Sequence, residues 1–337
     1  MKNHISIKSI MLATCAVAAL TACSDWTEPE SITLVENGID KQQGEAYAKY
    51  LANLRDYKSQ DHKVVYGWFD NSEKTPFTRG QHISDVPDSL DVVIAKTPEL
   101  TDAEVAEVEQ LHHKGTKVFF SLSYDRIKKA YEEAVKEAGE TRDFATVLSD
   151  EVNKVMALQA PFDGLVVEYK GSSPVYMTSA EKAEASAHQK TILNAVQSWK
   201  GANGDKKLAF YGYPAHLLDL ATILNDCQHI ILVTDKVGDK QQYGIEAMQA
   251  LISTSVPADR FVVSVSTVSL DTTDKNTGFL GDARATTEAA YWVTEPTEGF
   301  TKAGMAILDI QNDYYNATNT YQYVREAIQI MNPAPSK

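Results

Sequence analysis

Eight short apolar runs alternate with stretches of helical pattern along the chain, and this alternation is the strongest constraint on its fold. Each run has the length and composition of a buried strand. The runs cover residues 62–69, 90–95, 117–124, 162–170, 207–213, 229–235, 260–266 and 303–310. Strict strand–helix alternation favours an α/β fold with a parallel sheet, and eight such units close most simply as a (β/α)8 TIM barrel. A doubly wound open sheet is the alternative.

The predicted helices have clear start signals. Thr101 and Glu104 form one Thr-x-x-Glu capping box, and Thr178 and Glu181 form another. Further helices are predicted over 44–56 and 144–158. No internal Pro/Gly/Ser-rich linker divides residues 44–333, so the sequence predicts a single domain over that range.

The N-terminus has the features of a secreted lipoprotein. Residues 1–22 form a signal peptide with early lysines and a short apolar stretch, and Leu20-Thr21-Ala22-Cys23 fits a lipobox. Residues 23–43 then form a flexible tether, with Cys23 as the lipidation site. Acidic residues after Cys23 resemble the surface-export signals of glycan-scavenging Gram-negative bacteria. We therefore expect an outer-membrane lipoprotein exposed at the cell surface; a plain secreted protein is the alternative.

Charge and cysteine content exclude several classes of function. The chain carries 32 basic and 46 acidic residues, a net charge of −14, which disfavours nucleic acid as a partner. Neutral glycans remain acceptable ligands. After lipidation of Cys23 the mature chain would keep only Cys227 as a thiol, so neither an intramolecular disulfide nor a cysteine-based metal site is expected.

The run over 162–170 differs from the others because it ends in charge. Phe162-Asp163-Gly164-Leu165-Val166-Val167-Glu168-Tyr169-Lys170 fits a buried parallel strand whose carboxyl end opens on a site. Alternate residues of a strand share a face, so Val166, Glu168 and Lys170 should point to the barrel axis, with Lys170 nearest the mouth.

This run resembles the central motif of glycoside hydrolase family 18, Asp-x-x-Asp-x-Asp-x-Glu on the fourth barrel strand. Asp163 and Gly164 match the family, whereas Val166, Glu168 and Lys170 stand where it has acidic residues. The run over 117–124 is similar to the family's Ser-x-Gly-Gly strand, with Ser121 at its serine. The resemblance extends over nearly all of residues 44–333 and is nearest to the endo-β-N-acetylglucosaminidase branch.

The resemblance implies a substrate-assisted hydrolysis that this chain should not perform. In the family the Glu protonates the glycosidic oxygen, and the Asp two residues earlier orients the substrate's attacking acetamide. Lys170 occupies the place of that Glu, and an ordinary lysine titrates near 10.4, which makes it a poor acid at neutral pH. General acid–base catalysis is worth roughly 10²–10⁴-fold, so turnover should fall towards background.

A shifted register could place Glu168 as the acid, with Asp163 supporting it. Such a shift by two residues would keep the inward face of the strand but must move strand or substrate by about 6.6 Å. This gives the enzymatic alternative, an active endo-β-N-acetylglucosaminidase that hydrolyses the chitobiose core. The simpler expectation is an ion pair between Lys170 and Glu168 at the mouth.

Aromatic and polar residues at the predicted strand ends suit a sugar ligand, because rings stack on C–H faces while polar groups bind hydroxyls. For each aromatic residue, core packing is the alternative, and Trp68 is the favoured platform. The predicted ligand-binding residues are Trp68, Tyr66, Tyr124, Glu168, Lys170, Tyr211, Tyr213, Asp235, Asp309 and Gln311.

No metal or cofactor is expected, because the histidines lack ligand spacing and the loop 271–278 lacks the final Glu of a calcium loop. The leading hypothesis is a non-catalytic surface lipoprotein that binds N-acetylglucosamine-containing glycans, N-glycans above all, for uptake. Outer-membrane glycan import proteins are possible partners. A third hypothesis is a structural partner of such an importer with no sugar site.

Overall fold

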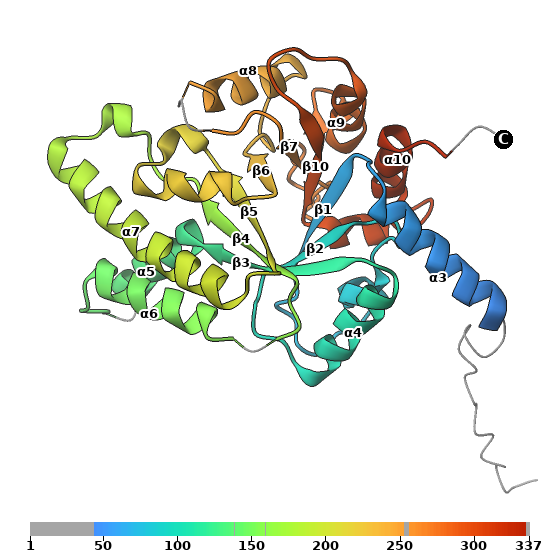
Figure 1. Ribbon diagram of the computed structural model, residues 1–337, viewed down its shortest axis with the longest axis horizontal. Coiled ribbons are helices and arrows are strands. Elements are labelled where there is room, and N and C mark those ends of the chain that lie inside the picture. Colours follow the sequence, from blue (N-terminus) through green and yellow to red (C-terminus); the bar gives the residue numbers. More distant parts are fainter. Residues whose placement is uncertain (1–43, 138, 159, 253–255, 335–337) are drawn as a thin grey trace, which may run out of the picture. The chain divides into compact units, whose positions relative to one another are not determined.

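The computed structural model describes residues 44–137, 139–158, 160–252 and 256–334, and within them the chain forms a closed barrel of parallel strands (Figure 1). Around the barrel the strand order is β1-β10-β7-β6-β5-β4-β3-β2. The predicted TIM barrel is therefore confirmed, and the open sheet is excluded. The barrel strands are β1 Val64–Phe69, β2 Val92–Ala95, β3 Lys117–Ser123, β4 Gly164–Tyr169, β5 Lys207–Gly212, β6 His229–Leu232, β7 Phe261–Ser266 and β10 Lys302–Leu308.

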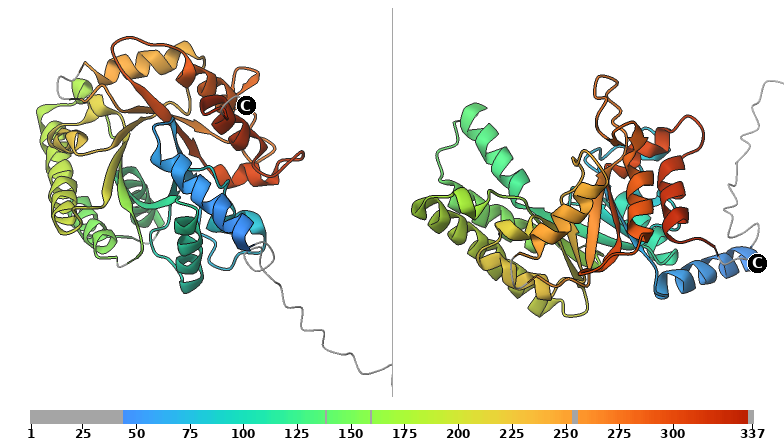
Figure 2. Two further views of the ribbon diagram at one scale, coloured as in Figure 1. Left: turned by 45° about the vertical axis from the view of Figure 1, so that its right-hand side comes forward. Right: turned by 90° about the horizontal axis from the view of Figure 1, so that it is seen from above.

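Helices surround the strands and cover their outer faces (Figure 2). The two predicted capping boxes are present, Thr101 with Glu104 at the start of α4 and Thr178 with Glu181 at the start of α7. A short hairpin of β8 Phe279–Leu280 and β9 Ala283–Arg284 precedes α9. The helices are α3 Gly44–Ser59, α4 Asp102–His113, α5 Tyr124–Glu137, α6 Phe144–Met156, α7 Ser179–Ala202, α8 Gln241–Ala250, α9 Ala285–Thr294 and α10 Gln322–Met331.

Two apolar clusters form the core. The larger lies between the outer faces of the strands and the helices, and the smaller fills the barrel interior. Interior positions demand close packing: a Cβ on Gly164 would lie 2.5 Å from the carbonyl oxygen of Lys207, so only glycine fits there. The buried interior residues are Tyr66, Trp68, Val92, Ile94, Phe119, Val166, Ala209, Tyr211, Ile231, Val233, Val262 and Ala306.

Several predicted strands were too long at their carboxyl ends. β3 ends at Ser123, because Tyr124 already begins α5, and β6 ends at Leu232, so that Asp235 lies in the following loop. The helix α5 was not predicted. Tyr124 follows the strand without a glycine or proline to mark the boundary, so it was assigned to the strand.

The predicted signal peptide over 1–22, the tether over 23–43 and the lipidation site Cys23 lie outside the described residues. The chain divides into a unit ending at Ala48 and a second unit, Lys49–Lys337, which contains the whole barrel. None of the helices in the described part of the chain is both long and apolar enough to cross a membrane.

Candidate functional site

Glu168 is the central side chain of the barrel mouth. It follows Val166 on the inward face of β4 and is 9% exposed. Its Oε1 accepts hydrogen bonds from Trp68 Nε1 at 2.8 Å and from Ser121 Oγ at 2.5 Å. Two donors on one oxygen, contributed by β1 and β3, fix the carboxylate in place.

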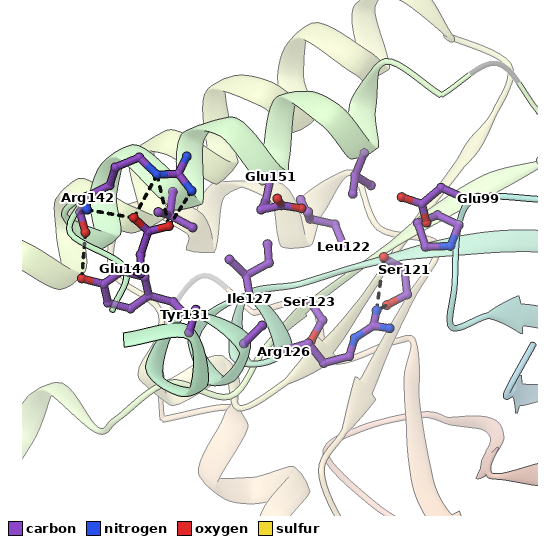
Figure 3. Close-up of a pocket in the computed structure, with 15 residues that line it drawn as sticks. Glu99, Ser121, Leu122, Ser123, Arg126, Ile127, Tyr131, Glu140, Arg142 and Glu151 are labelled. Atoms are coloured by element: carbon purple, nitrogen blue, oxygen red, sulfur yellow. Dashed lines mark hydrogen bonds and ion pairs between the residues drawn. The ribbon is translucent and has the colours of Figure 1, made fainter. Parts of the chain in front are cut away.

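Arg126 extends this network to the outside of the barrel. It lies in the first turn of α5, and its Nη2 donates to Ser121 Oγ at 2.6 Å. Figure 3 shows the guanidinium turned toward Ser121 at one end of a cavity of about 370 Å³ between α5 and α6. Because Arg126 donates to the serine oxygen, the serine proton is free to point at Glu168.

Trp68 is buried rather than open to a ligand. Its side chain is 2% exposed, and its ring centroid lies 5.1 Å from that of Tyr211. The indole therefore packs inside the barrel and donates to Glu168. This burial contradicts the prediction that Trp68 offers an open ring face to a sugar.

Lys170 leaves β4 at the mouth and does not pair with Glu168. Its Nζ lies 5.1 Å from the centroid of the Tyr211 ring, and no ion pair joins it to Glu168 within the described residues. The predicted pair was wrong because Trp68 and Ser121 already hold the carboxylate inside the barrel. A cation over a ring face is a favourable contact in its own right.

A polar cavity of about 250 Å³ lies beside Lys170. Tyr211 Oη donates to Asp235 Oδ1 at 3.4 Å next to it, and burial, followed by the nearby Asp235 and Glu168 charges, raises the pKa of that phenol. Burial also raises the pKa of Glu246. Lysine ammonium groups, carboxylates and a phenol therefore lie at one cavity, and these groups can form hydrogen bonds with a hydroxyl-rich ligand. Its lining is Lys170, Tyr213, Val233, Asp235, Lys236, Val237, Gln242 and Glu246.

The opposite side of the mouth carries a second charged group. Lys96 follows β2, and its Nζ lies 2.5 Å from Asp309 Oδ1 and 3.9 Å from Asp70 Oδ2. Asp309 adopts a left-handed backbone with φ 51°, a conformation that aspartate and asparagine tolerate better than most residues other than glycine. Gln311 Oε1 accepts from the Asp70 amide at 3.2 Å. Asp309 and Gln311 therefore reach the mouth, where each already has a protein partner.

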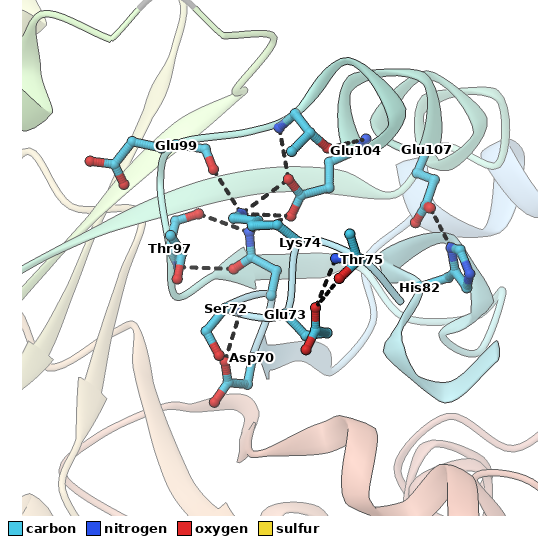
Figure 4. A network of polar contacts seen from close by, with 12 residues as sticks. Asp70, Ser72, Glu73, Lys74, Thr75, His82, Thr97, Glu99, Glu104 and Glu107 are labelled. Carbon is cyan, nitrogen blue, oxygen red and sulfur yellow. Dashed lines mark hydrogen bonds and ion pairs between the residues drawn. The ribbon is translucent and has the colours of Figure 1, made fainter. Parts of the chain in front are cut away.

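The loop after β1 is joined to the first turn of α4 by polar contacts (Figure 4). Lys74 Nζ lies 2.9 Å from Glu104 Oε1, and the same carboxylate accepts from the Asn71 amide at 3.0 Å. Burial alone would raise the pKa of Glu104, but hydrogen bonds from the Thr101 amide and Lys74 lower it. The ionised form of Glu104 therefore stabilises this side of the rim.

The family model for glycoside hydrolase family 18, BT1044-like, matches residues 27–330. The chain belongs to this family. A search of curated protein sequences gave no match. The family's fold is the barrel described above.

Solved structures share the fold at low sequence identity. An endo-β-N-acetylglucosaminidase from Cordyceps militaris is 17% identical with a TM-score of 0.58, covering 85% of this chain and 96% of that one. A selenomethionine form of BT1044 is 16% identical with a TM-score of 0.58, covering 87% and 95%. A variant of the Cordyceps militaris enzyme, in complex with fucosyl-N-acetylglucosamine-Asn, is 17% identical with a TM-score of 0.55, covering 84% and 95%.

In this family 18 chain, two predicted ligand residues lie away from the mouth. Tyr66 points to the amino ends of the strands, where its Oη lies 2.7 Å from His229 Nδ1 and accepts from Gln228 at 2.7 Å. Tyr124 is buried outside the barrel, with its ring centroid 4.8 Å from that of Tyr169. Both predictions were wrong because strand ends were placed without knowing which way each ring turns.

Asp163 also lies at the amino end of β4. Its Oδ2 accepts from His112 Nε2 and from the Val118 amide, both at 2.8 Å. Burial alone would raise the pKa of Asp163, but these hydrogen bonds lower it. Asp163 therefore links β4 to β3 and α4, and it cannot support Glu168 from the opposite end of the strand.

Sequence reasoning missed Lys96, Arg126 and Asp125 at the mouth. Lys96 directly follows a buried strand, so the rule that selected Lys170 would also have selected it. Arg126 and Asp125 gave no such signal, because they belong to the helix α5, which was not predicted. The predicted residues that do gather at the mouth are Trp68, Glu168, Lys170, Tyr211, Tyr213, Asp235, Asp309 and Gln311.

Proposed function

We propose that this chain is a non-catalytic, lipid-anchored glycan-binding protein that takes N-acetylglucosamine-containing N-glycans at the barrel mouth for uptake. One observation carries the proposal: Lys170 directly follows β4, at the place where the family motif has its acid, and its ammonium lies over the Tyr211 ring. An ammonium in that position has no carboxylic proton to give to a leaving sugar.

The environment of Glu168 supports the loss of catalysis. Its Oε1 is occupied by donors from Trp68 and Ser121, and it is almost completely buried. A general acid must carry a proton within hydrogen-bond reach of the leaving oxygen. Glu168 would have to exchange both donors and move outward before it could do so.

The cavity beside Lys170 supports ligand binding. Asp235 and Gln242 offer hydrogen-bond acceptors and donors to sugar hydroxyls, and Tyr213 adds ring surface. A fungal enzyme of similar fold was solved with fucosyl-N-acetylglucosamine-Asn bound. We propose that the same chemical class of ligand binds here.

The test is binding without turnover, measured on the full chain in detergent. On a glycan array we expect retention of N-glycans, and in calorimetry we expect Asp235→Ala to weaken binding about tenfold by removing a hydrogen bond to a charged acceptor. Lys49→Ala on the exposed face of α3 is the matched control and should bind as wild type does. Absence of N-glycan binding by the wild type would refute the proposal.

The alternative is an active endo-β-N-acetylglucosaminidase that hydrolyses the chitobiose core. The hydrogen bond between Ser121 and Glu168 favours it, because it retains a carboxylate beside the family serine. Mass spectrometry of high-mannose and complex N-glycoproteins after long incubation separates the two. We expect intact glycans; release that disappears in Glu168→Gln would establish the enzyme instead.

A further inference from the structure

The loop between β4 and α7 exposes two large apolar side chains in succession. Val175 is 79% exposed and Tyr176 is 89% exposed, although both follow Lys170, the residue directly after β4, by only a few residues. They lie in a 3-10 turn, Pro174–Tyr176, that leads to the start of α7. Together they offer an apolar surface next to the mouth loop that a small ligand can cover.

The loop is fastened at the point where it leaves the strand. The amides of Lys170 and Gly171 donate to the Asp125 carboxylate at 2.7 and 3.3 Å, and the carbonyl oxygen of Lys170 lies 2.6 Å from His216 Nδ1. Gly171 has a φ of +50°, and a Cβ there would lie 2.5 Å from the Tyr169 ring.

The tip of the loop is ordered by its own backbone. The Tyr176 amide donates to the Ser173 carbonyl at 3.2 Å, and the Met177 amide donates to the Pro174 carbonyl at 3.3 Å. Pro174 also restricts the turn at its first position. The phenol ring is therefore exposed on a backbone fixed relative to Lys170, which lowers the entropy lost on binding.

Resting on the function proposed above, we propose that Tyr176 and Val175 form an outer stacking surface for the antennae of a branched N-glycan. The innermost sugars would occupy the mouth beside Lys170, and an outer sugar would lay its C–H face on the Tyr176 ring.

A sugar fits this surface better than a protein partner. Two adjacent side chains between Ser173 and Thr178 offer far less area than the roughly 1,000 Å² that a stable protein interface requires. One aromatic side chain can cover the face of a pyranose ring. Such stacking needs no charge on the ligand, so the net charge of −14 on the chain does not oppose it.

The experiment compares two ligands by calorimetry on the full chain in detergent. One is a branched complex N-glycan, and the other is its core trimmed of all antennae. We expect Tyr176→Ala to weaken binding of the branched glycan roughly tenfold and to leave the core affinity unchanged, whereas Tyr176→Phe keeps the ring and should bind both as wild type does. Tyr291→Ala, which removes a 50% exposed tyrosine on α9, is the control.

The outcomes separate this inference from the function on which it rests. If the wild type binds both glycans and Tyr176→Ala binds the branched one equally well, the proposed outer stacking surface is refuted, whereas the proposed function stands. An equal loss for core and branched glycan would also refute it, because the loop would then act on the mouth. Failure of the wild type to bind either glycan would refute both proposals together.

Discussion

The Glu168 carboxylate is held by hydrogen bonds from two other strands of the barrel. It is buried in the barrel and satisfied by Trp68 and Ser121, with Arg126 behind the serine. A buried charge without such donors would be strongly unfavourable. The donors come from β1 and β3, so the carboxylate holds two strands that are not neighbours in the barrel.

We expect Trp68→Phe to lower the free energy of unfolding by about 1–3 kcal/mol, since it retains a ring but leaves Glu168 with one donor fewer. Trp68→Ala should lower it further, by about 3–5 kcal/mol, because a cavity forms inside the barrel. Urea unfolding followed by circular dichroism measures both. Tyr291→Phe on the exposed face of α9 is the control, and a Trp68→Phe protein as stable as wild type would contradict the role assigned to the indole.

At the scale of elements, β4 is held differently at its two ends. The amino end is joined to β3 and α4 through Asp163, and the carboxyl end is joined to α5 through the amides that bind Asp125. These contacts explain why the strand can carry a charged residue in the barrel interior without losing its register. Asp163 therefore contributes to the stability of the fold and is not part of the site at the mouth.

Asp163→Asn should destabilise the fold by about 1–3 kcal/mol at neutral pH, because it weakens hydrogen bonds from His112 and Val118. The pKa of Asp163 is lowered in the folded state, so its contribution is complete above the ordinary carboxyl pKa of about 4 and is lost as pH falls through the lowered value.

Urea unfolding at pH 7 and at successively lower pH down to about 3 measures this effect, and the difference between wild type and Asp163→Asn should shrink as the pH falls. Asp205→Asn, at an exposed position, should show no such difference at any pH. A gap between wild type and Asp163→Asn that stayed constant with pH would show that the ionised carboxylate contributes nothing.

The same elements show what the sequence can and cannot predict. Apolar runs located all the barrel strands, because a buried strand is recognisable from its own residues. The capping boxes at Thr101 and Thr178 are equally local. The burial of Trp68 is not local, since it depends on Glu168 and Tyr211 from other strands. The position of Lys170 over Tyr211 depends likewise on a neighbouring strand.

For the whole molecule, the closed barrel and the acidic charge both oppose association through strand pairing. Closure leaves no free strand edge in the barrel for pairing with another chain. A net charge of −14 adds long-range repulsion between copies. Both properties suit the surface lipoprotein that we propose, because anchoring confines many copies to a plane.

We expect Cys23→Ala to release the protein from the membrane fraction, because the lipobox cysteine is the proposed site of the lipid. Fractionation of cells followed by immunoblotting measures the distribution. Cys227→Ala, which removes a buried thiol, is the control and should remain with the membrane. If Cys23→Ala stays in the pellet as wild type does, another segment holds the protein there.

The network around Glu168 also bears on the reversibility of the change at this motif. Replacing Glu168 by the shorter Asp that the family uses would withdraw the oxygen from Trp68 and Ser121 and leave two buried donors without a partner. On the proposal that the chain is non-catalytic, Glu168→Asp would thus lower the stability of the fold before it restored any activity. A return to the family motif would therefore require compensating substitutions at Trp68 and Ser121 as well as at Glu168.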